Sequence, residues 1–180
     1  MAKTTATSPA KGRRKTPDAA VRCTAYGHRL VCCLLAICVL AACDRRIVYD
    51  TYRQTPAEGW EHQDTLSYHI DTIPATGNYC LHLGIRTSTA HHYPFRNLYL
   101  VVKEYWNAPD TCLVDTLLCH LTDEDGDLDG AGTGFRQYTF PVSKLTLTEH
   151  STGTISVRHI MRRTELTGVS DIGIRLEKAD

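Results

Sequence analysis

The sequence predicts an all-β protein: a single antiparallel β-sandwich domain, of jelly-roll or immunoglobulin-like type, that follows a signal peptide. Apolar and polar residues alternate with a period of two in seven segments. No segment shows an apolar stripe with the period of a helix. Gly, Pro, Asn and Asp, which favour turns, gather between the segments. Short strands at this spacing are typical of a sandwich or barrel.

Each predicted strand has an apolar face of its own. In the first, Leu66, Tyr68 and Ile70 alternate with polar residues, and the later segments repeat this pattern. Segment 98–103 is apolar on nearly both faces, which predicts a central strand. Residues 43–180 are long enough to enclose one self-sufficient core. The predicted strands cover 66–70, 79–86, 98–103, 111–121, 138–142, 155–158 and 172–177.

Charge divides the chain into two parts. Residues 1–42 carry seven basic residues and one acid, whereas residues 43–180 carry 13 basic and 19 acidic residues, a net charge of −6. An acidic body repels phosphate backbones, so we predict no nucleic-acid binding. Residues 30–42 are uncharged and nearly all apolar. They are too few to span a bilayer, which takes about 20 residues, and fit the apolar region of a signal peptide.

Cys43 follows this apolar region in the sequence Leu40-Ala41-Ala42-Cys43, which matches the lipobox of bacterial lipoproteins. In such signals the thiol is the nucleophile that receives a diacylglyceryl group, and a peptidase then cuts before the Cys. We therefore predict that Cys43 is the lipid attachment site and that acyl chains such as palmitate anchor the protein to a membrane. The predicted organisation is a signal peptide with a long basic region over 1–42, a lipidated Cys and tether over 43–60, and the sandwich over 61–180.

Three cysteines, Cys80, Cys112 and Cys119, remain after Cys43 is lipidated and the signal peptide is removed. Three is odd, so at least one thiol is unpaired in the monomer. Cys112 and Cys119 are about 23 Å apart in one extended strand, too far for a disulfide. We expect buried structural thiols.

An acidic segment, residues 123–129, resembles the first half of an EF-hand-type calcium loop. Its acids stand at alternate positions, but position twelve, where calcium loops have a bidentate Glu, is Arg136. The alternative is a hairpin whose glycines permit a sharp reversal. We favour the hairpin and keep calcium as the weaker alternative. The alternating acids are Asp123, Asp125, Asp127 and Asp129.

No pattern fixes a metal centre or a catalytic group. His91 and His92 are adjacent, and a third ligand would have to come from His82, His120 or elsewhere. The chain has no G-x-S-x-G, P-loop or HExxH motif, and its other acids are scattered. We therefore expect no metal site, no cofactor besides the covalent lipid, no catalytic residue and no enzyme activity.

Aromatic residues offer a second hypothesis, a surface lipoprotein that binds glycans. Sugar stacking needs an exposed, coplanar pair of rings beside polar groups, whereas aromatic residues more often pack within strands and cores. The candidates are Tyr49, Tyr52, Trp60, Tyr93, Tyr99, Tyr105 and Trp106.

Four stretches together resemble the GldH family, the gliding-motility lipoproteins of Bacteroidetes. They are CDRRIVYDTYRQTPAEGW, GIRTSTAHHYPFRNLYLVV, DTLLCHLTDEDGDLDGAGTGF and HIMRRTELTGVSDIGIRLEK. Their order and spacing are similar to the family pattern: Tyr-Asp then Gly-Trp, a Tyr-Pro block, an Asp-x-Asp-Gly turn, and a closing Gly-Val-x-Asp-x-Gly.

The resemblance implies an accessory lipoprotein of the cell envelope, needed for gliding and linked to type IX secretion, that acts by contact with other proteins. It implies Cys43 as the acylated residue and no enzyme chemistry. In these bacteria, acids just after the lipidated Cys are associated with surface export. Here Asp44 is followed by Arg45 and Arg46, so we expect the periplasmic face of the outer membrane.

Overall fold

The computed structural model describes residues 46–89, 92–122 and 130–179, and these residues form strands and loops without a helix. Accordingly, this part of the chain offers no helix of the length and apolar character needed to cross a membrane. The strands are β1 (Ile47–Gln54), β2 (Trp60–Glu61), β3 (Leu66–Ile70), β4 (Gly77–Ser88), β5 (Asn97–Asn107), β6 (Asp110–His120), β7 (Phe135–Leu147), β8 (Gly153–His159), β9 (Glu165–Leu166) and β10 (Val169–Lys178).

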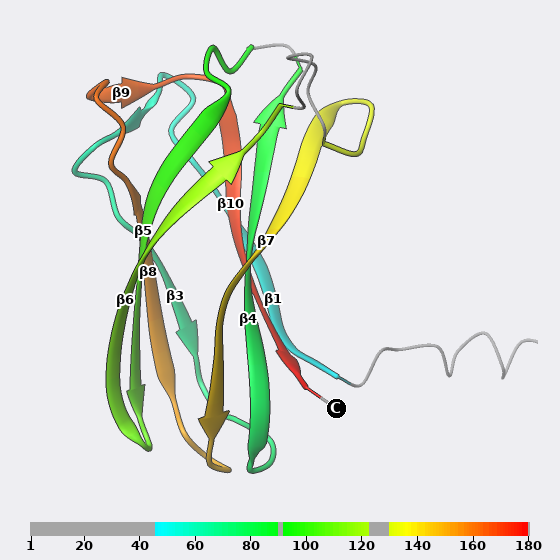
Figure 1. The fold of residues 1–180 in the computed structure, drawn as a ribbon, viewed down its shortest axis with the longest axis vertical. Coiled ribbons are helices and arrows are strands. Elements are labelled where there is room, and N and C mark those ends of the chain that lie inside the picture. Colours follow the sequence, from blue (N-terminus) through cyan, green and yellow to red (C-terminus); the bar gives the residue numbers. More distant parts are fainter. Residues whose placement is uncertain (1–45, 90–91, 123–129, 180) are drawn as a thin grey trace, which may run out of the picture. The chain divides into compact units, whose positions relative to one another are not determined.

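Two four-stranded antiparallel sheets pack face to face (Figure 1). The first has the order β1-β10-β4-β7 and the second the order β3-β8-β5-β6, while β2 and β9 form a short two-stranded ribbon. Eight strands divided between two sheets in this order form a jelly roll. The predicted all-β sandwich is therefore confirmed, and of the two types left open the strand order is that of the jelly roll.

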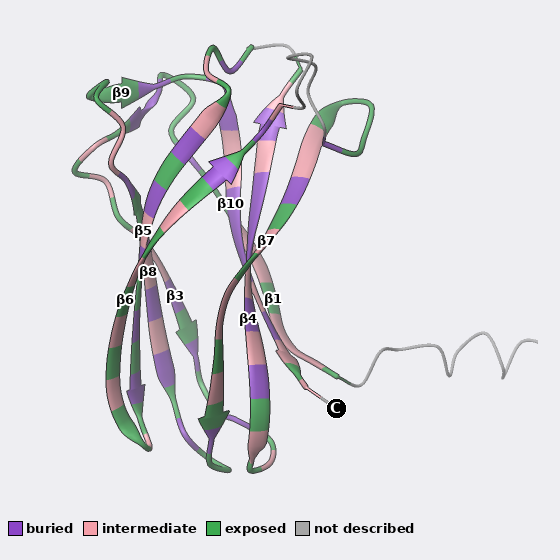
Figure 2. Cartoon of the chain, in the orientation of Figure 1, coloured by how far each residue is buried: buried purple, intermediate pink, exposed green. Residues whose placement is uncertain are grey.

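The core lies between the inner faces of the two sheets (Figure 2). Along β5, buried Leu98, Leu100 and Val102 alternate with more exposed residues, as a strand with one covered face requires. β5 lies between β8 and β6, which confirms the predicted central strand, but only its inner face is buried, and Tyr99 and Lys103 on its outer face are exposed. The hydroxyl of Tyr68 on β3 donates to the carbonyl of Ile172 on β10 at 2.7 Å, so a buried hydrogen bond joins the sheets.

The domain begins earlier than the sequence predicts. Residues 47–54, assigned above to a tether, form edge strand β1 and pair with β10 from Ile47↔Glu177 to Gln54↔Asp171. Trp60, at the end of the predicted tether, is fully buried. The boundary was misplaced because β1 is covered only partly on each face, so its residues show no clear alternation.

The three cysteines among the described residues, Cys80, Cys112 and Cys119, are free thiols in different environments. Cys112 and Cys119 both lie on β6, and the straight strand between them excludes a bridge, as expected. Cys119 is buried, and burial raises the pKa of its thiol to about 12. Cys112 is exposed, which corrects the expectation that all three thiols are buried, because its side chain lies on the outer face of an edge strand.

Candidate functional site

Two predicted features lie outside the described residues. These are Cys43, the predicted lipid attachment site, and the acids of the calcium-type segment, Asp123, Asp125, Asp127 and Asp129. The structure does describe the C-terminal side of that segment. The main chains of Ala131 and Gln137 exchange two hydrogen bonds, and Arg136, at the twelfth position, donates through Nη1 to the carbonyl of Gly130 at 2.9 Å. Arg136 therefore closes a glycine-containing turn and has the wrong charge for a calcium ligand.

The histidines considered as metal ligands have separate partners. His82 on β4 lies 3.2 Å from Glu177 Oε1, on the first sheet. His120 on β6 lies 2.8 Å from Asn97 Oδ1, on the second sheet. His92 is exposed, and His91 lies outside the described residues. Across residues 46–89, 92–122 and 130–179, no three or more His, Cys, Asp or Glu side chains come together in a way that would hold a metal.

The aromatic residues considered for sugar stacking are distributed over the whole domain. Trp60, Trp106 and Tyr93 are buried in the core. Tyr99 and Tyr105 are 40% and 49% exposed on one face of β5. They are six residues apart, which is about 20 Å along a strand, so they do not form a stacking pair. The half-buried Tyr49 and Tyr52 belong to β1.

The ring of Tyr52 packs over two glycines on the outer face of the first sheet, which together form what we call the glycine floor. Gly84 on β4 and Gly173 on β10 are directly opposite each other. A Cβ on Gly84 would lie 2.7 Å from Tyr52 Cζ, and one on Gly173 would lie 2.5 Å from Tyr52 Cε1. Only glycine leaves room for the ring at these two positions. The guanidinium of Arg86 stacks 3.7 Å above the centre of the ring, and its Nε donates to Gln137 Oε1 at 3.2 Å.

The surface around Tyr52 is a shallow polar hollow of about 120 Å³. Burial raises the pKa of the Tyr52 hydroxyl, and the charge of Arg86 acts in the opposite direction. Beside it, Arg175 Nε lies 3.4 Å from Glu177 Oε2, which leaves that cation paired. The hollow is thus a packed structural feature in which the ring, the glycines and Arg86 support one another.

We expect Tyr52→Ala to destabilise the domain by about 1–2 kcal/mol, because it uncovers the glycine floor and removes the cation–π contact of Arg86. Tyr52→Phe keeps the ring and is expected to change stability by less than about 0.5 kcal/mol. Urea unfolding followed by tryptophan fluorescence measures both. Equal losses for the two variants would show that the hydroxyl, and not the ring, matters.

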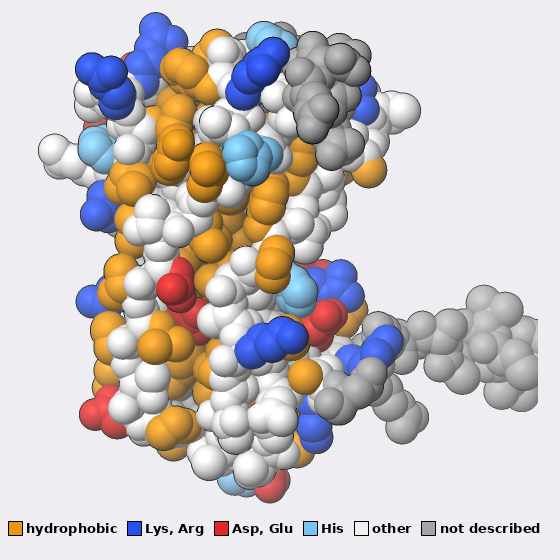
Figure 3. Space-filling view, in the orientation of Figure 1, with side chains coloured by type: hydrophobic (Ala, Val, Ile, Leu, Met, Phe, Trp, Pro, Cys, Tyr) orange, Lys and Arg blue, Asp and Glu red, His pale blue; other side chains and the backbone are white. Residues whose placement is uncertain are grey.

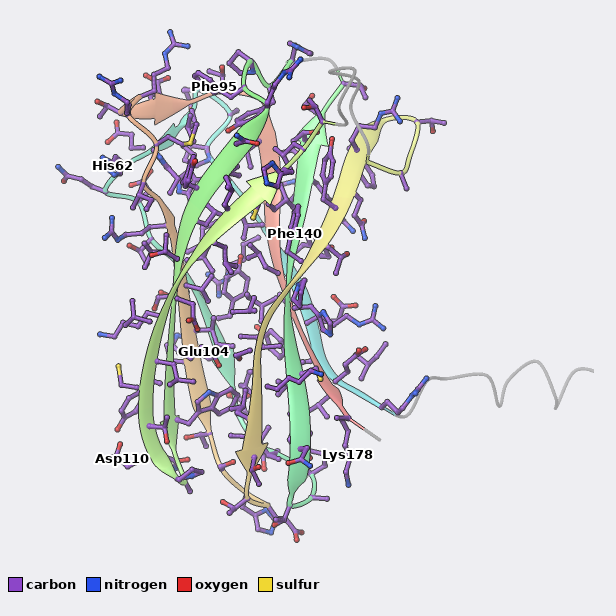
Figure 4. The ribbon with its side chains drawn as sticks, in the orientation of Figure 1. His62, Phe95, Glu104, Asp110, Phe140 and Lys178 are labelled. Atoms are coloured by element: carbon purple, nitrogen blue, oxygen red, sulfur yellow. The ribbon has the colours of Figure 1, made fainter. Side chains whose placement is uncertain are left out.

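A larger apolar hollow lies at the end of the domain that carries β2 and β9. Its volume is about 470 Å³, and Figure 4 shows Phe95 and His62 at this end. The main-chain N–H of Tyr99 points to Met161 Sδ at 3.4 Å. The hollow joins the outer face of β5 at Tyr99. It is lined by Phe95, Tyr99, Ile160, Met161, Arg162 and Arg163.

Glu104 is a fully buried acid in the core, on the inner face of β5. It accepts hydrogen bonds from Trp106 Nε1 at 3.2 Å and from the Ser143 hydroxyl at 2.6 Å. Burial raises the pKa of Glu104, the two hydrogen bonds lower it, and the charge of Asp115 raises it further. Neither hollow described above includes Glu104 in its lining.

The sequence patterns missed Glu104, and they named Tyr52 only as a candidate for sugar stacking and not as the cover of two glycines. The alternation of segment 98–103 continues through Glu104 and Trp106. A predicted strand that reached Asn107 would therefore have included Glu104 as an acid on its apolar face. For Tyr52 the only sequence signal is the pair of glycines inside the predicted strands, which marks a close approach of another group.

Comparison with known proteins agrees with the resemblance noted from the motifs. Residues 47–176 match the family described as GldH lipoprotein. A relative named gliding motility lipoprotein GldH homolog, from Christiangramia forsetii, is 26% identical over 156 residues, covering 82% of this chain and 93% of that protein. The gliding motility lipoprotein GldH of Flavobacterium johnsoniae is 28% identical over 159 residues, covering 82% and 94%.

A family 35 carbohydrate binding module from Clostridium thermocellum aligns over 73% of this chain and 92% of that chain, with a TM-score of 0.39 and 10% identity. The family match, in contrast, spans nearly all of the described domain, from the start of β1 into β10. This chain belongs to the GldH lipoprotein family.

Proposed function

We propose that this protein is a lipid-anchored accessory component of the gliding-motility machinery, associated with type IX secretion, that acts by contact with other envelope proteins and not by catalysis. The names of the two relatives support the association with gliding. The lipid would be attached at Cys43, and we place the domain at the periplasmic face of the outer membrane.

The position of β1 is the observation that carries this proposal. Only residues 44–46 separate Cys43 from the first strand residue, Ile47. A fully extended chain spans at most about 3.6 Å per residue, so Ile47 is held within about 14 Å of the lipidated residue. A domain held this close to a membrane has a high effective concentration toward partners in the same membrane.

Metabolic labelling with a fatty acid tests the anchor. Wild-type protein is expected to take up label and to fractionate with membranes, and Cys43→Ser is expected to lose both properties. Cys112→Ser is the matched control, because Cys112 is an exposed thiol of the folded domain and its loss leaves the anchor unchanged. Label that persists in Cys43→Ser would refute the assignment.

Complementation of a deletion strain tests the function. The wild-type gene is expected to restore colony spreading or export of a type IX cargo, whereas Cys43→Ser, expressed at the same level, is not. Normal spreading and export in the deletion strain itself would exclude the proposed role.

A further inference from the structure

The jelly roll has four edge strands, and three of them carry features that discourage pairing with another chain. β3 has only five residues. β1 has an irregular register between Ile47 and Tyr49. β7 contains Pro141 and a bulge beside it, where the register shifts between Leu81 and His82 of β4. Short length, bulges and proline are the usual protections of a sheet edge.

β6 has none of these protections. It is eleven residues long, pairs with β5 from Asn107↔Asp110 to Asn97↔His120 without a register shift, and contains neither Pro nor Lys. It is the last strand of its sheet, and no strand of the described residues pairs with its other side. A long and regular edge without these protections is a template for pairing with another strand, and its inward-facing Asp115 is the one charge that such a strand has to match.

The outward backbone groups of β6 can be assigned from the ladder. The carbonyl of Tyr99 on β5 accepts a hydrogen bond from Ile160 N–H, on the side of β5 that faces β8. Its cross-strand partner Leu118 therefore makes no main-chain bond to β5, and its N–H and C=O point to the free edge. Along a strand, N–H and C=O groups point to the same edge at every second residue. The main-chain groups of Cys112, Val114, Thr116 and Leu118 therefore all point to the free edge.

Exposed apolar side chains border the same edge. Of the five exposed large hydrophobic residues among those described, four lie on β5 and β6. Val114 is 61% exposed and Leu118 43% exposed, and Leu118 stands opposite Tyr99 in the ladder. Figure 3 shows apolar side chains along the face of the molecule that carries β6 and β7.

On its inner side, the β6 edge borders apolar residues that the core covers only partly. Leu117 on β6, and Phe140 and Val142 on β7, pack against the core and stay half-buried. A strand added to β6 would cover this margin as well as the backbone groups, so it would bury more apolar surface than edge pairing alone.

The charges on β6 indicate which kind of strand would bind to it. β6 carries two carboxylates, Asp110 and Asp115, and neither Lys nor Arg. Asp115 also acts electrostatically on the buried carboxyl of Glu104. A second copy of β6 would bring more carboxylates and no cation, whereas a strand with a basic residue would neutralise Asp115.

We propose that β6 is the docking edge of this protein and accepts an extended strand from a different protein, with apolar residues at alternate positions and a Lys or Arg beside Asp115. Main-chain hydrogen bonds to Cys112, Val114, Thr116 and Leu118 provide the pairing, and the exposed apolar side chains fix the register. This inference rests on the proposed function, because it names the surface through which the protein contacts its partner.

Site-specific photo-cross-linking in the native envelope tests the proposal. The photo-reactive residue p-benzoylphenylalanine replaces Cys112, Val114, Thr116 or Leu118 one at a time, and mass spectrometry locates the attachment points. Strand pairing predicts attachment to one segment of one other protein, at positions that shift by two residues with each step along β6. The control is the same residue at exposed Thr139 on the protected edge strand β7, which should give no such series.

Thr116→Pro provides the backbone test. Proline is tolerated on an edge strand where the N–H faces solvent, so the domain should fold, but the variant removes one outward donor and obstructs the incoming strand. Cross-linking from position 114 is expected to fall about tenfold. Thr116→Val keeps the N–H and should cross-link like wild type. If Thr116→Pro fails to fold, Leu118→Lys, which adds an edge charge without changing the backbone, replaces it.

The outcomes separate this proposal from the proposed function. Attachment to a second copy of this chain, scattered attachment, or no attachment would overturn the docking edge, even if complementation still requires Cys43. Conversely, an ordered series of attachments in cells whose spreading and export do not depend on this gene would support the edge and reject the role in gliding.

Discussion

Gly153→Val is expected to lower the free energy of unfolding by about 3 kcal/mol, at the upper end for overpacking of a core. Gly153 begins β8 and stands opposite Trp106 in the ladder with β5. A Cβ at this position would lie 2.5 Å from Trp106 Cε3. The indole ring cannot move aside easily, because it is fully buried and its Nε1 donates to Glu104.

Thermal unfolding measures this loss as a decrease in Tm of about 10 °C for a domain of this size. Gly134→Val is the matched control, since a Cβ at Gly134 would have no atom within 4 Å apart from those of its two chain neighbours. We expect the control to change Tm by less than about 2 °C. Similar losses in both variants would indicate that the backbone freedom of glycine matters and not the contact with Trp106.

Glu104→Gln is expected to stabilise the domain at neutral pH. The glutamine side chain can keep both hydrogen bonds, because its Oε1 can accept from Trp106 Nε1 and its Nε2 can donate to the Ser143 hydroxyl oxygen. The substitution removes a negative charge that burial makes unfavourable. The gain is about 1.4 kcal/mol for every unit by which the pKa of Glu104 differs between the folded and unfolded chain.

The gain depends on pH in a defined direction. The folded chain raises the pKa of Glu104, so the folded state binds this proton more tightly than the unfolded state. The wild type therefore has the full stabilising contribution below the unfolded pKa, about 4.3, and loses it as pH rises through the folded pKa. Urea titrations of both proteins from acidic to neutral pH should show a difference that grows with pH.

Asp115→Asn serves as the control for the electrostatic cause. It removes the nearby charge that raises the pKa of Glu104, so it should stabilise the wild type more than it stabilises Glu104→Gln. A difference between wild type and Glu104→Gln that stays constant with pH would mean that packing, and not ionisation, separates them.

The fold could be predicted from the sequence where strands are buried on one face. Segment 98–103 shows this, because Leu98, Leu100 and Val102 fill the core and their alternation marks the strand. The assignment of strands to sheets could not be predicted, since the paired strands, apart from the β5–β6 hairpin, are far apart in the chain. β1 and β10 are the first and last strands in the sequence of the domain, and no local pattern predicts that they pair.

The candidate site was predictable only in part. Local sequence is enough to predict Cys43 as the lipid attachment site, because a peptidase reads a lipobox as an extended signal and not as part of a fold. The β6 edge could not be recognised in the same way. Segment 111–121 reads as an ordinary strand, and its importance depends on what the other three edges contain and on which side of β5 it lies.

The pairing of β1 with β10 has a mechanical consequence. The predicted anchor at Cys43 lies just before Arg46 in the sequence, and the chain continues from Arg46 directly into β1, which is joined to β10 along its length (Figure 1). A pull on Cys43 along the axis of β1 loads the hydrogen bonds of this ladder together, in shear, and not one after another as in peeling. Tension between the membrane and a partner bound to β6 would therefore pass through the whole sandwich. The β1–β10 ladder would bear this tension on the membrane side.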